Sequence, residues 1–468
     1  MSCENCDSCT LNTERPKCSE CPENKESIVI PADLEVTREN IEKYYADQVH
    51  LLDTDQTDDL DLFCYAKCTN NSPEFVKKCR GVVFHGNELV MRAFPYTVDY
   101  PHTDLQTLER LFENFSKFSV FDSYEGSLIR VFNFNGRWFL STHRKLDAFR
   151  SKWSSRDSFG VHFLRALEEE VKNNAELRNL MNEKGTSEPD NTLLSRFFSI
   201  LDPEKQYMFL VLNGVENRIV CQPAERPTMY HVGTFVDHVL TLTSDIPVTS
   251  PSKHHFLNID ELVDYVSKID WTRLQGVICF GPDNTQIKVV HDSYLDNFRV
   301  RGNEPILRHR YLQVRMDSDM LDKLKNLYPE RATEFKEYEN TLYEIAKDIR
   351  NSYVSRFIKK QWTVKPQEEF QVMRECHDWH FLDKENNKIN DDKVIEVMNR
   401  QSWMCLNQMM KHFRTNVVGG QAYNSTRNTN YSSFNGEGRG RGRGRGRGQF
   451  HPRTFQPRYL PTRERTEE

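Results

Sequence analysis

The chain has 468 residues, 37% of them hydrophobic and including 29 Phe and 18 Tyr, which is enough for two or three domains with hydrophobic cores. Its composition excludes a membrane span, because no stretch approaches the roughly 18–20 consecutive apolar residues required. The net charge is −6, but residues 421–468 hold ten Arg and four Glu; this tail therefore carries +6 and the rest of the chain about −12. We expect an acidic body whose basic tail contacts nucleic acid.

The start of the chain is polar and cysteine-rich, unlike a signal peptide, so we expect a cytoplasmic protein that does not contact membranes. Two Cys-x-x-Cys pairs separated by a short loop have the ligand spacing of a small zinc site. We therefore predict a zinc-knuckle-like segment over residues 1–27. Its zinc ligands would be Cys6, Cys9, Cys18 and Cys21, with Cys3 as an alternative ligand. The other interpretation is a cysteine-rich leader that oxidises or binds metal adventitiously.

Residues 28–304 show an α+β pattern dominated by antiparallel strands. Short helices and strands are predicted over 35–116, including a hairpin that turns at 85–87. A second hairpin is predicted over 117–142, turning at 133–136, and an amphipathic helix over 157–183. Further strands are predicted at 207–212, 217–221, 276–280 and 286–290. We expect these elements to form one domain.

Residues 305–415 have the apolar spacing of amphipathic helices, broken at Pro329 and Pro366, and predict a separate helical domain. Residues 416–468 are of low complexity and are predicted to be disordered. The tail contains five consecutive Arg-Gly repeats. Arginines bind phosphates and stack on bases, which predicts contact with RNA or single-stranded nucleic acid; the alternative is a charged solubility tail. The arginines of the repeats are Arg439, Arg441, Arg443, Arg445 and Arg447.

Five short segments within residues 60–300 point to a known family. They are Cys-Arg-Gly-Val-Val-Phe at 79–84 with Arg-Ala-Phe-Pro at 92–95, Ser-Tyr-Glu-Gly-Ser-Leu at 123–128, Glu-Asn-Arg-Ile-Val at 216–220, Gln-Gly-Val-Ile at 275–278 and Gln-Ile-Lys-Val at 286–289. In this order they resemble the motifs of the phage RNA ligase 1 family, a group of covalent nucleotidyltransferases with relatives in large DNA viruses. The resemblance implies an antiparallel-sheet nucleotidyltransferase fold over residues 28–304.

The resemblance also implies which positions of the family's chemistry have changed. The lysine that accepts the nucleotide is matched by a serine, whose hydroxyl cannot replace the amine without an activating base. Two glutamates that assist metal and nucleotide binding are matched by neutral residues, and one of two lysines that stabilise phosphate charge is matched by glutamine. The changed positions are Ser123, Val211, Gln275 and Gln286.

The positions that fit the family predict a cleft for nucleotide or RNA. Its expected binding residues are Arg80, Arg92, Glu125, Arg130, Arg218 and Lys288, with Glu125 fixing the turn or orienting a hydroxyl. The pattern favours an RNA-binding pseudoenzyme over an active ligase.

Three alternatives stay open. One is an active ATP-dependent RNA ligase or end-repair enzyme with a displaced nucleophile, Lys78 or Lys117. Another is a virus-associated structural protein that condenses RNA through its tail. The third is a set of ordinary buried strands that match the motifs by chance. ATP and Mg²⁺ are expected only if nucleotide binding or ligase activity is retained, and the oligomeric state is left open.

Overall fold

The computed structural model describes residues 34–92, 94–185 and 192–423. The predicted zinc ligands and the Arg-Gly repeats lie outside the described residues. One compact unit ends at Lys411, and the second begins at His412. In the part of the chain that is described, no helix is long and apolar enough to cross a membrane.

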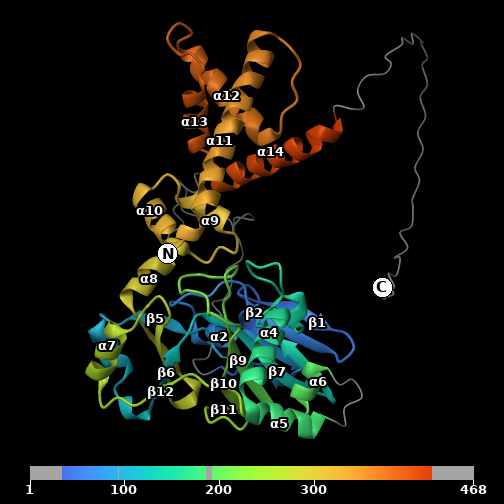
Figure 1. Ribbon diagram of the computed structural model, residues 1–468, viewed down its shortest axis with the longest axis vertical. Coiled ribbons are helices and arrows are strands. Elements are labelled where there is room, and N and C mark those ends of the chain that lie inside the picture. The colour runs from blue at the N-terminus through green and yellow to red at the C-terminus, as the bar shows by residue number, and fades with distance from the viewer. Residues whose placement is uncertain (1–33, 93, 186–191, 424–468) are drawn as a thin grey trace, which may run out of the picture. The chain divides into compact units, whose positions relative to one another are not determined.

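Three β-sheets form the part of the molecule before residue 291 (Figure 1). The first has the strand order β1-β2-β3-β4, and all its pairs are antiparallel. Its strands span Val49–Asp55, Leu60–Tyr65, Arg80–His85 and Glu88–Met91.

The second sheet has the order β11-β10-β9-β7-β8 and is also antiparallel throughout. Its strands, in that order, span Val239–Thr241, Met229–Val236, Lys205–Leu212, Gly126–Phe134 and Arg137–Ser141. The third sheet has the order β12-β6-β13-β14-β5, with a parallel pair only between β14 and β5. Its strands span Lys253–His254, Ser119–Ser123, Gly276–Phe280, Gln286–Val290 and Val98–Pro101.

Helices cover these sheets and bury one hydrophobic cluster against each. Helices α1 (Arg38–Tyr44) and α2 (Glu74–Lys78) contribute to the cluster on the first sheet. Helices α4, α5 and α6 pack on the second sheet, and α3 and α7 on the third. These helices span Phe159–Asn173, Ala175–Lys184, Leu193–Phe198, Leu105–Leu111 and Ile259–Lys268. Short 3₁₀ turns lie at Phe115–Lys117, Ala148–Arg150 and Pro282–Asn284.

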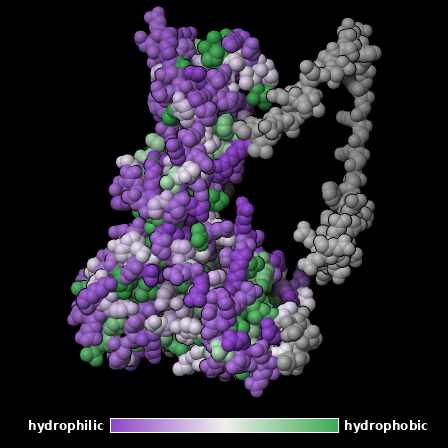
Figure 2. Space-filling model, in the orientation of Figure 1, coloured by the Kyte–Doolittle hydropathy of each residue, from purple (hydrophilic) through white to green (hydrophobic). Residues whose placement is uncertain are grey.

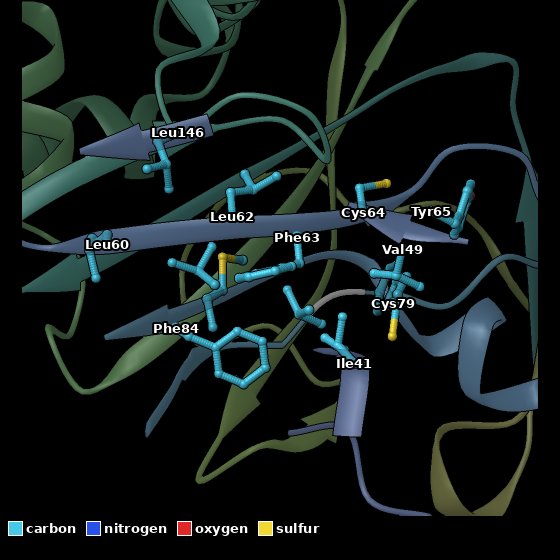
Figure 3. Packing of buried hydrophobic residues seen from close by; sticks show 14 of the residues in the cluster. Ile41, Val49, Leu60, Leu62, Phe63, Cys64, Tyr65, Cys79, Phe84 and Leu146 are labelled. Carbon is cyan, nitrogen blue, oxygen red and sulfur yellow. The ribbon is translucent and has the colours of Figure 1, made fainter. Parts of the chain in front are cut away.

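The strand β2 illustrates why the first sheet is buried on both faces. Successive side chains of a strand point to opposite faces. Figure 3 shows Phe63 of β2 on the side that holds Phe84 of β3, while Leu62 points the other way, toward Leu146. The rings of Phe63 and Phe84 meet edge to face with centroids 5.8 Å apart. Because both faces are covered, β2 is apolar along nearly its whole length.

From α8 onward, every described element is helical (Figure 1). The helices α8 to α14 span Asp292–Arg301, Leu307–Val314, Ser318–Leu327, Ala332–Tyr353, Gln367–Leu382, Asp391–Asn399 and Trp403–Tyr423. A 3₁₀ turn at Pro329–Arg331 precedes α11, and a π-helix at Val354–Ile358 extends it. The predicted breaks are confirmed, since Pro329 opens the 3₁₀ turn and Pro366 caps α12.

The predicted α+β class with antiparallel sheets and a following helical region is confirmed. The hairpin at 85–87 is confirmed as β3–β4. Two local predictions were wrong. The second hairpin contains only β7 and β8, because β6 leaves it to pair with β12 and β13. Residues 217–221 form a loop rather than a strand, because a buried carboxylate binds their backbone N–H groups.

Candidate functional site

A cavity of about 320 Å³, called the central cavity here, is lined by strands of the second and third sheets. Strand β6 of the third sheet runs into β7 of the second through Tyr124 and Glu125, and both residues line the cavity. Six residues singled out from the sequence also line it: Arg80, Ser123, Glu125, Gln275, Gln286 and Lys288. The structure therefore brings together positions that are up to about 200 residues apart in the chain.

The buried side chains of Ser123 and Gln275 contact each other on one side of the cavity. Ser123 is 5% exposed and pairs with Gly276 across the β6–β13 ladder, which places the two side chains together. The Ser123 hydroxyl donates a hydrogen bond to Oε1 of Gln275 at 3.2 Å. The Gln275 amide nitrogen in turn donates to the Tyr294 hydroxyl at 2.6 Å.

The same chain of hydrogen bonds ends on a carboxylate. The Tyr294 hydroxyl of α8 donates to Oε2 of Glu125 at 3.4 Å. Burial, followed by the nearby negative charge of Glu125, raises the pKa of Tyr294 well above its ordinary value, so its proton stays on the phenol. We call these four side chains the Ser123–Glu125 network. Each of the three hydrogen bonds in this network joins two protein side chains.

Glu125 binds a backbone loop through both of its oxygens. Oε1 accepts from the N–H of Ile219 at 2.8 Å, and Oε2 accepts from the N–H groups of Val220 at 2.8 Å and Cys221 at 3.1 Å. The Asn213 amide nitrogen also donates to Oε1, at 3.3 Å. A buried carboxylate that accepts several N–H bonds holds a loop in one conformation. The contacts therefore give Glu125 the turn-fixing role expected from the sequence.

Two cations lie among the cavity's lining residues. The ammonium of Lys288 is 3.3 Å from Oδ1 of Asp99, where the parallel strands β14 and β5 run side by side. The guanidinium of Arg80 donates to the carbonyl of Pro95 at 3.4 Å. Neither cation is fully buried, so both can exchange these contacts for a phosphate.

The acidic side chains at the cavity already have partners. Asp99 faces Lys288, and Glu125 binds the loop described above. Asp122 accepts from the Tyr265 hydroxyl at 3.0 Å and lies 2.8 Å from Nε2 of His254. In the described residues no three His, Cys, Asp or Glu side chains come together as a metal-binding group. The arrangement does not fit the open carboxylate set that Mg²⁺ requires.

Much of the remaining cavity wall is apolar or aromatic, with polar side chains such as Thr97, His231 and Ser250 among it. The ring of Phe280 lies 5.7 Å from that of Phe94 and 5.9 Å from that of Phe121, centroid to centroid. Leu128 and Ile278 add aliphatic surface from β7 and β13. The cavity therefore combines apolar and aromatic surface with two cations, Lys288 and Arg80.

Four of the residues singled out from the sequence lie away from the cavity lining. Val211 points from β9 into the hydrophobic cluster beneath α4–α6, so an acid at this position would not face the cavity. Arg92 lies after β4, where its backbone N–H donates to Gln206 at 3.2 Å. Lys78 and Lys117, the candidate displaced nucleophiles, are exposed and do not line the cavity.

The remaining two are buried arginines that bind backbone carbonyls. Arg130 is fully buried; it donates to the carbonyls of Gly81 and Thr142 and to the Ser141 hydroxyl, joining three strands. Burial lowers its pKa, although a guanidinium keeps its charge in proteins. Arg218 donates to the carbonyls of Val220 and Cys221 and to Glu330 of the helical region.

Sequence reasoning missed Asp99 and Tyr294. Asp99 comes from a short strand whose neighbour in the sheet is almost 200 residues away, and Tyr294 comes from a helix outside the five motifs. The only signal for Tyr294 was its place a few residues after the last motif.

Comparisons with known proteins place this chain among viral relatives. No protein-family model matches it. It is 28% identical over 342 residues to the immediate-early protein ICP-46 homolog of Invertebrate iridescent virus 6, a match that covers 68% of this chain and 71% of that protein. The ICP-46 homolog of Invertebrate iridescent virus 3 is 27% identical over 237 residues, 50% of this chain and 48% of that protein.

A more distant relative is named for ligase activity. The "Putative bifunctional polynucleotide kinase/RNA ligase" of Autographa californica nuclear polyhedrosis virus is 24% identical over 234 residues, which cover 47% of this chain and 30% of that protein. The chain thus spans about half or less of the second and third of these relatives. The expected resemblance to viral proteins and to an RNA ligase is confirmed.

Solved structures of ligases resemble the chain only weakly. An archaeal ATP-dependent RNA ligase aligns over 77% of this chain and 74% of its own, with 13% identity and a TM-score of 0.31. The "Putative ATP-dependent DNA ligase from Aquifex aeolicus" aligns over 63% of this chain and 77% of its own, with 9% identity and a TM-score of 0.34.

Proposed function

We propose that this protein is an RNA-binding pseudo-ligase that holds a nucleotide or an RNA end in the central cavity without forming a covalent nucleotide adduct. The observation that carries the proposal is the contact between Ser123 and Gln275. A serine becomes a nucleophile when a base takes its proton, and the acceptor 3.2 Å from the Ser123 hydroxyl is a neutral amide oxygen, which is not a base.

The retained features support binding. Lys288 and Arg80 offer positive charge at one part of the cavity, and the aromatic wall offers a surface for a base. An ATP-like ligand fits these residues, and when bound it would place its phosphates against the two cations. The carboxylates are engaged within the protein, so we propose nucleotide binding that does not depend on Mg²⁺.

Adenylylation tests the absence of chemistry. We expect incubation of the full-length protein with labelled ATP and Mg²⁺ to give no acid-labile protein–AMP adduct. A stoichiometric adduct on any lysine would overturn the proposal. Repeating the reaction with Lys288→Ala, and separately with the candidate displaced nucleophiles Lys78→Ala and Lys117→Ala, identifies which lysine would carry such an adduct.

Binding at the cavity has its own test. We expect Lys288→Ala to weaken binding of RNA carrying a 5′-phosphate more than binding of the same RNA without it, because a phosphate contact is lost. Lys117→Ala, which changes an exposed lysine outside the cavity, should leave both affinities unchanged. Equal effects of Lys288→Ala on the two RNAs would exclude recognition of RNA ends by the cavity.

The same assays distinguish the alternative functions. An active RNA ligase or end-repair enzyme would show the adduct and require a lysine near the nucleotide; Lys288 is the lysine among the lining residues. A virus-associated structural protein would lose all RNA binding when residues 421–468 are deleted, whereas the pseudo-ligase keeps a weaker, end-dependent component.

The termini extend the proposal. The Arg-Gly repeats would add sequence-independent RNA affinity. Cys6, Cys9, Cys18 and Cys21 would hold one zinc ion in a small knuckle, which metal analysis of the purified protein and of a Cys18→Ser, Cys21→Ser variant can check. The whole protein would act in the cytoplasm, in the domain organisation given by the sequence: 1–27, 28–304, 305–415 and 416–468.

A further inference from the structure

The end of α11 and the segment that follows it expose aromatic and cationic side chains together. Trp362 is 84% exposed, and Phe381 of α12 is 55% exposed. We call this region the tip surface and define it by Arg356, Lys359, Lys360, Trp362, Phe381 and Lys384. Figure 2 shows hydrophobic residues at the surface over the α11 and α12 elements, among hydrophilic ones.

Ring contacts hold the tip surface together. The Phe357 ring stacks on His377 at 4.1 Å, and Phe381 meets the same imidazole edge to face at 4.5 Å. The Lys384 ammonium lies 4.2 Å from the centroid of Phe381, and the Arg356 guanidinium lies 5.4 Å from that of Trp362. A cation therefore flanks each exposed ring, with Phe381 on α12 and Trp362 on the segment between the π-helix and α12.

The segment that holds Trp362 is locally basic, whereas Phe381 and Lys384 stand among the acids Asp378, Asp383 and Glu385. Residues 354–364 contain three cations and no acid. Within the described residues, neither Lys359 nor Lys360 has a salt-bridge partner. Elsewhere in the helical region, some surface lysines pair with acids one turn away, as Lys323 does with Asp319 at 2.7 Å and Lys347 with Glu344 at 2.8 Å.

We propose that the tip surface binds single-stranded nucleic acid, with bases stacked on Trp362 and Phe381 and phosphates on Lys359, Lys360 and Lys384. Unpaired lysines beside exposed rings match an anionic chain of planar bases. An apolar protein partner would leave these lysines without counter-charge, and a second copy would bring identical positive segments together. This inference rests on the proposed role in RNA binding and adds a second contact site on the helical region.

Anisotropy titrations of the full-length protein with a labelled single-stranded RNA of about 20 nucleotides test the proposal. We expect Trp362→Ala to weaken binding by about 5-fold to 100-fold, since one stacked base is lost. Lys359→Ala with Lys360→Ala should lower the slope of log Kd against log salt by about 1.4, because two phosphate contacts on a single strand disappear. The matched controls are Tyr343→Ala, a partly exposed aromatic of α11, and Lys325→Ala with Lys336→Ala; they should leave affinity and slope unchanged.

A photocrosslink checks the contact directly and does not depend on how much the tail contributes. RNA carrying 4-thiouridine should crosslink to peptides that contain Trp362 or Phe381. Unchanged affinity and slope without such crosslinks would overturn the proposal. So would tip variants that bind RNA normally but change the sedimentation of the protein, since the surface would then serve self-association.

The cavity variant separates this inference from the proposed function. If Lys288→Ala leaves end-dependent binding intact while the tip variants weaken RNA binding, the cavity proposal fails and the tip surface stands. If Lys288→Ala acts as expected and the tip variants behave like the wild type, the tip surface fails alone.

Discussion

At the scale of single residues, the central cavity contains polar side chains that stabilise the fold as well as groups available to a ligand. Glu125 binds three consecutive backbone N–H groups and a tyrosine, while Arg130, which lies outside the cavity lining, binds the carbonyls of Gly81 in β3 and of Thr142 just after β8. Such groups are buried, and their partners would be left unsatisfied without them. Lys288 and Arg80, by contrast, keep partial access to the cavity and make single contacts.

Glu125→Gln, which removes one negative charge and keeps the size of the side chain, should destabilise the protein. One carboxylate oxygen becomes an NH₂ group, which cannot accept, so either the N–H bond of Ile219 or those of Val220 and Cys221 are lost. We expect a loss of about 2–4 kcal/mol in the free energy of unfolding, measured by urea titration. Glu109→Gln, on the exposed face of α3, is the control and should change little. Equal stabilities of the two variants would contradict the loop-holding role.

His231 should make stability depend on pH. The ring is buried and contacts the hydroxyls of Ser244 and Thr234 at 2.8 and 2.9 Å. Burial, partly offset by Asp245, lowers the pKa of His231 from 6.5 to about 4. As the pH falls through 6.5, the imidazole becomes protonated in the unfolded chain but stays neutral in the folded protein. The contribution of His231 to the free energy of unfolding is therefore complete above pH 6.5 and is lost as the pH falls toward about 4.

The expected size of that loss is about 3 kcal/mol. The difference between the urea midpoints of the wild type and of His231→Gln should decrease as the pH is lowered from 7.5 to 4.5, whatever its value at pH 7.5. His255→Gln, which removes an exposed histidine, should run parallel to the wild type. A parallel course for His231→Gln would show that folding does not lower the pKa of His231.

At the scale of elements, close backbone contacts determine how β6, β13 and β14 pair. Gly276 has φ +156° and opens β13 between Ser123 of β6 and Val290 of β14. A Cβ atom at this position would lie 2.0 Å from the carbonyl oxygen of Val289. The glycine therefore allows three strands to approach where Ser123 and Gln275 meet.

Gly276→Ala should disrupt this part of the third sheet. We expect a loss above about 3 kcal/mol, since backbone atoms rather than a flexible side chain would have to move. Gly86→Ala is the matched control: it also has positive φ, +56°, but nothing lies within 4 Å of the added methyl. That control should lose only about 1–2 kcal/mol, from backbone strain. Thermal unfolding of both variants gives the comparison, and similar losses would exclude the packing argument.

Local patterns predicted the elements whose partners are near in sequence. The β3–β4 hairpin follows from its turn at 85–87, and the interruptions at Pro329 and Pro366 follow from backbone chemistry. The strand predicted at 217–221 was wrong because Glu125, about 95 residues earlier, binds the N–H groups that a ladder would use. Motif order predicted that Ser123, Gln275 and Lys288 share a site. It could not place Asp99 and Tyr294, which reach the cavity through a parallel strand pair and a helix.

At the scale of the whole molecule, the charge is divided between an acidic body and a basic tail. Because the acidic body repels a polyanion, we expect RNA to approach the protein through its positive segments. The tip surface and the Arg-Gly repeats are two such segments, and the central cavity contributes two further cations.

Deletion of residues 421–468 should reduce the salt dependence of RNA binding. With ten arginines removed, the slope of log Kd against log salt is expected to fall by up to about 7. A variant with the five arginines from Arg439 to Arg447 changed to Lys keeps the charge and should retain the slope while losing stacking affinity. An unchanged slope after the deletion would show that the body alone carries the phosphate contacts.

The Ser123–Glu125 network also determines how reversible the proposed loss of chemistry is. A lysine introduced at 123 would place a buried ammonium against a neutral amide, and a glutamate introduced at 275 would place a buried carboxylate beside a hydroxyl and a phenol. Either single change is penalised, and only the two together give a charge pair. If the proposed pseudo-ligase function is correct, a variant that regains both charges would have to pass through a less stable single variant.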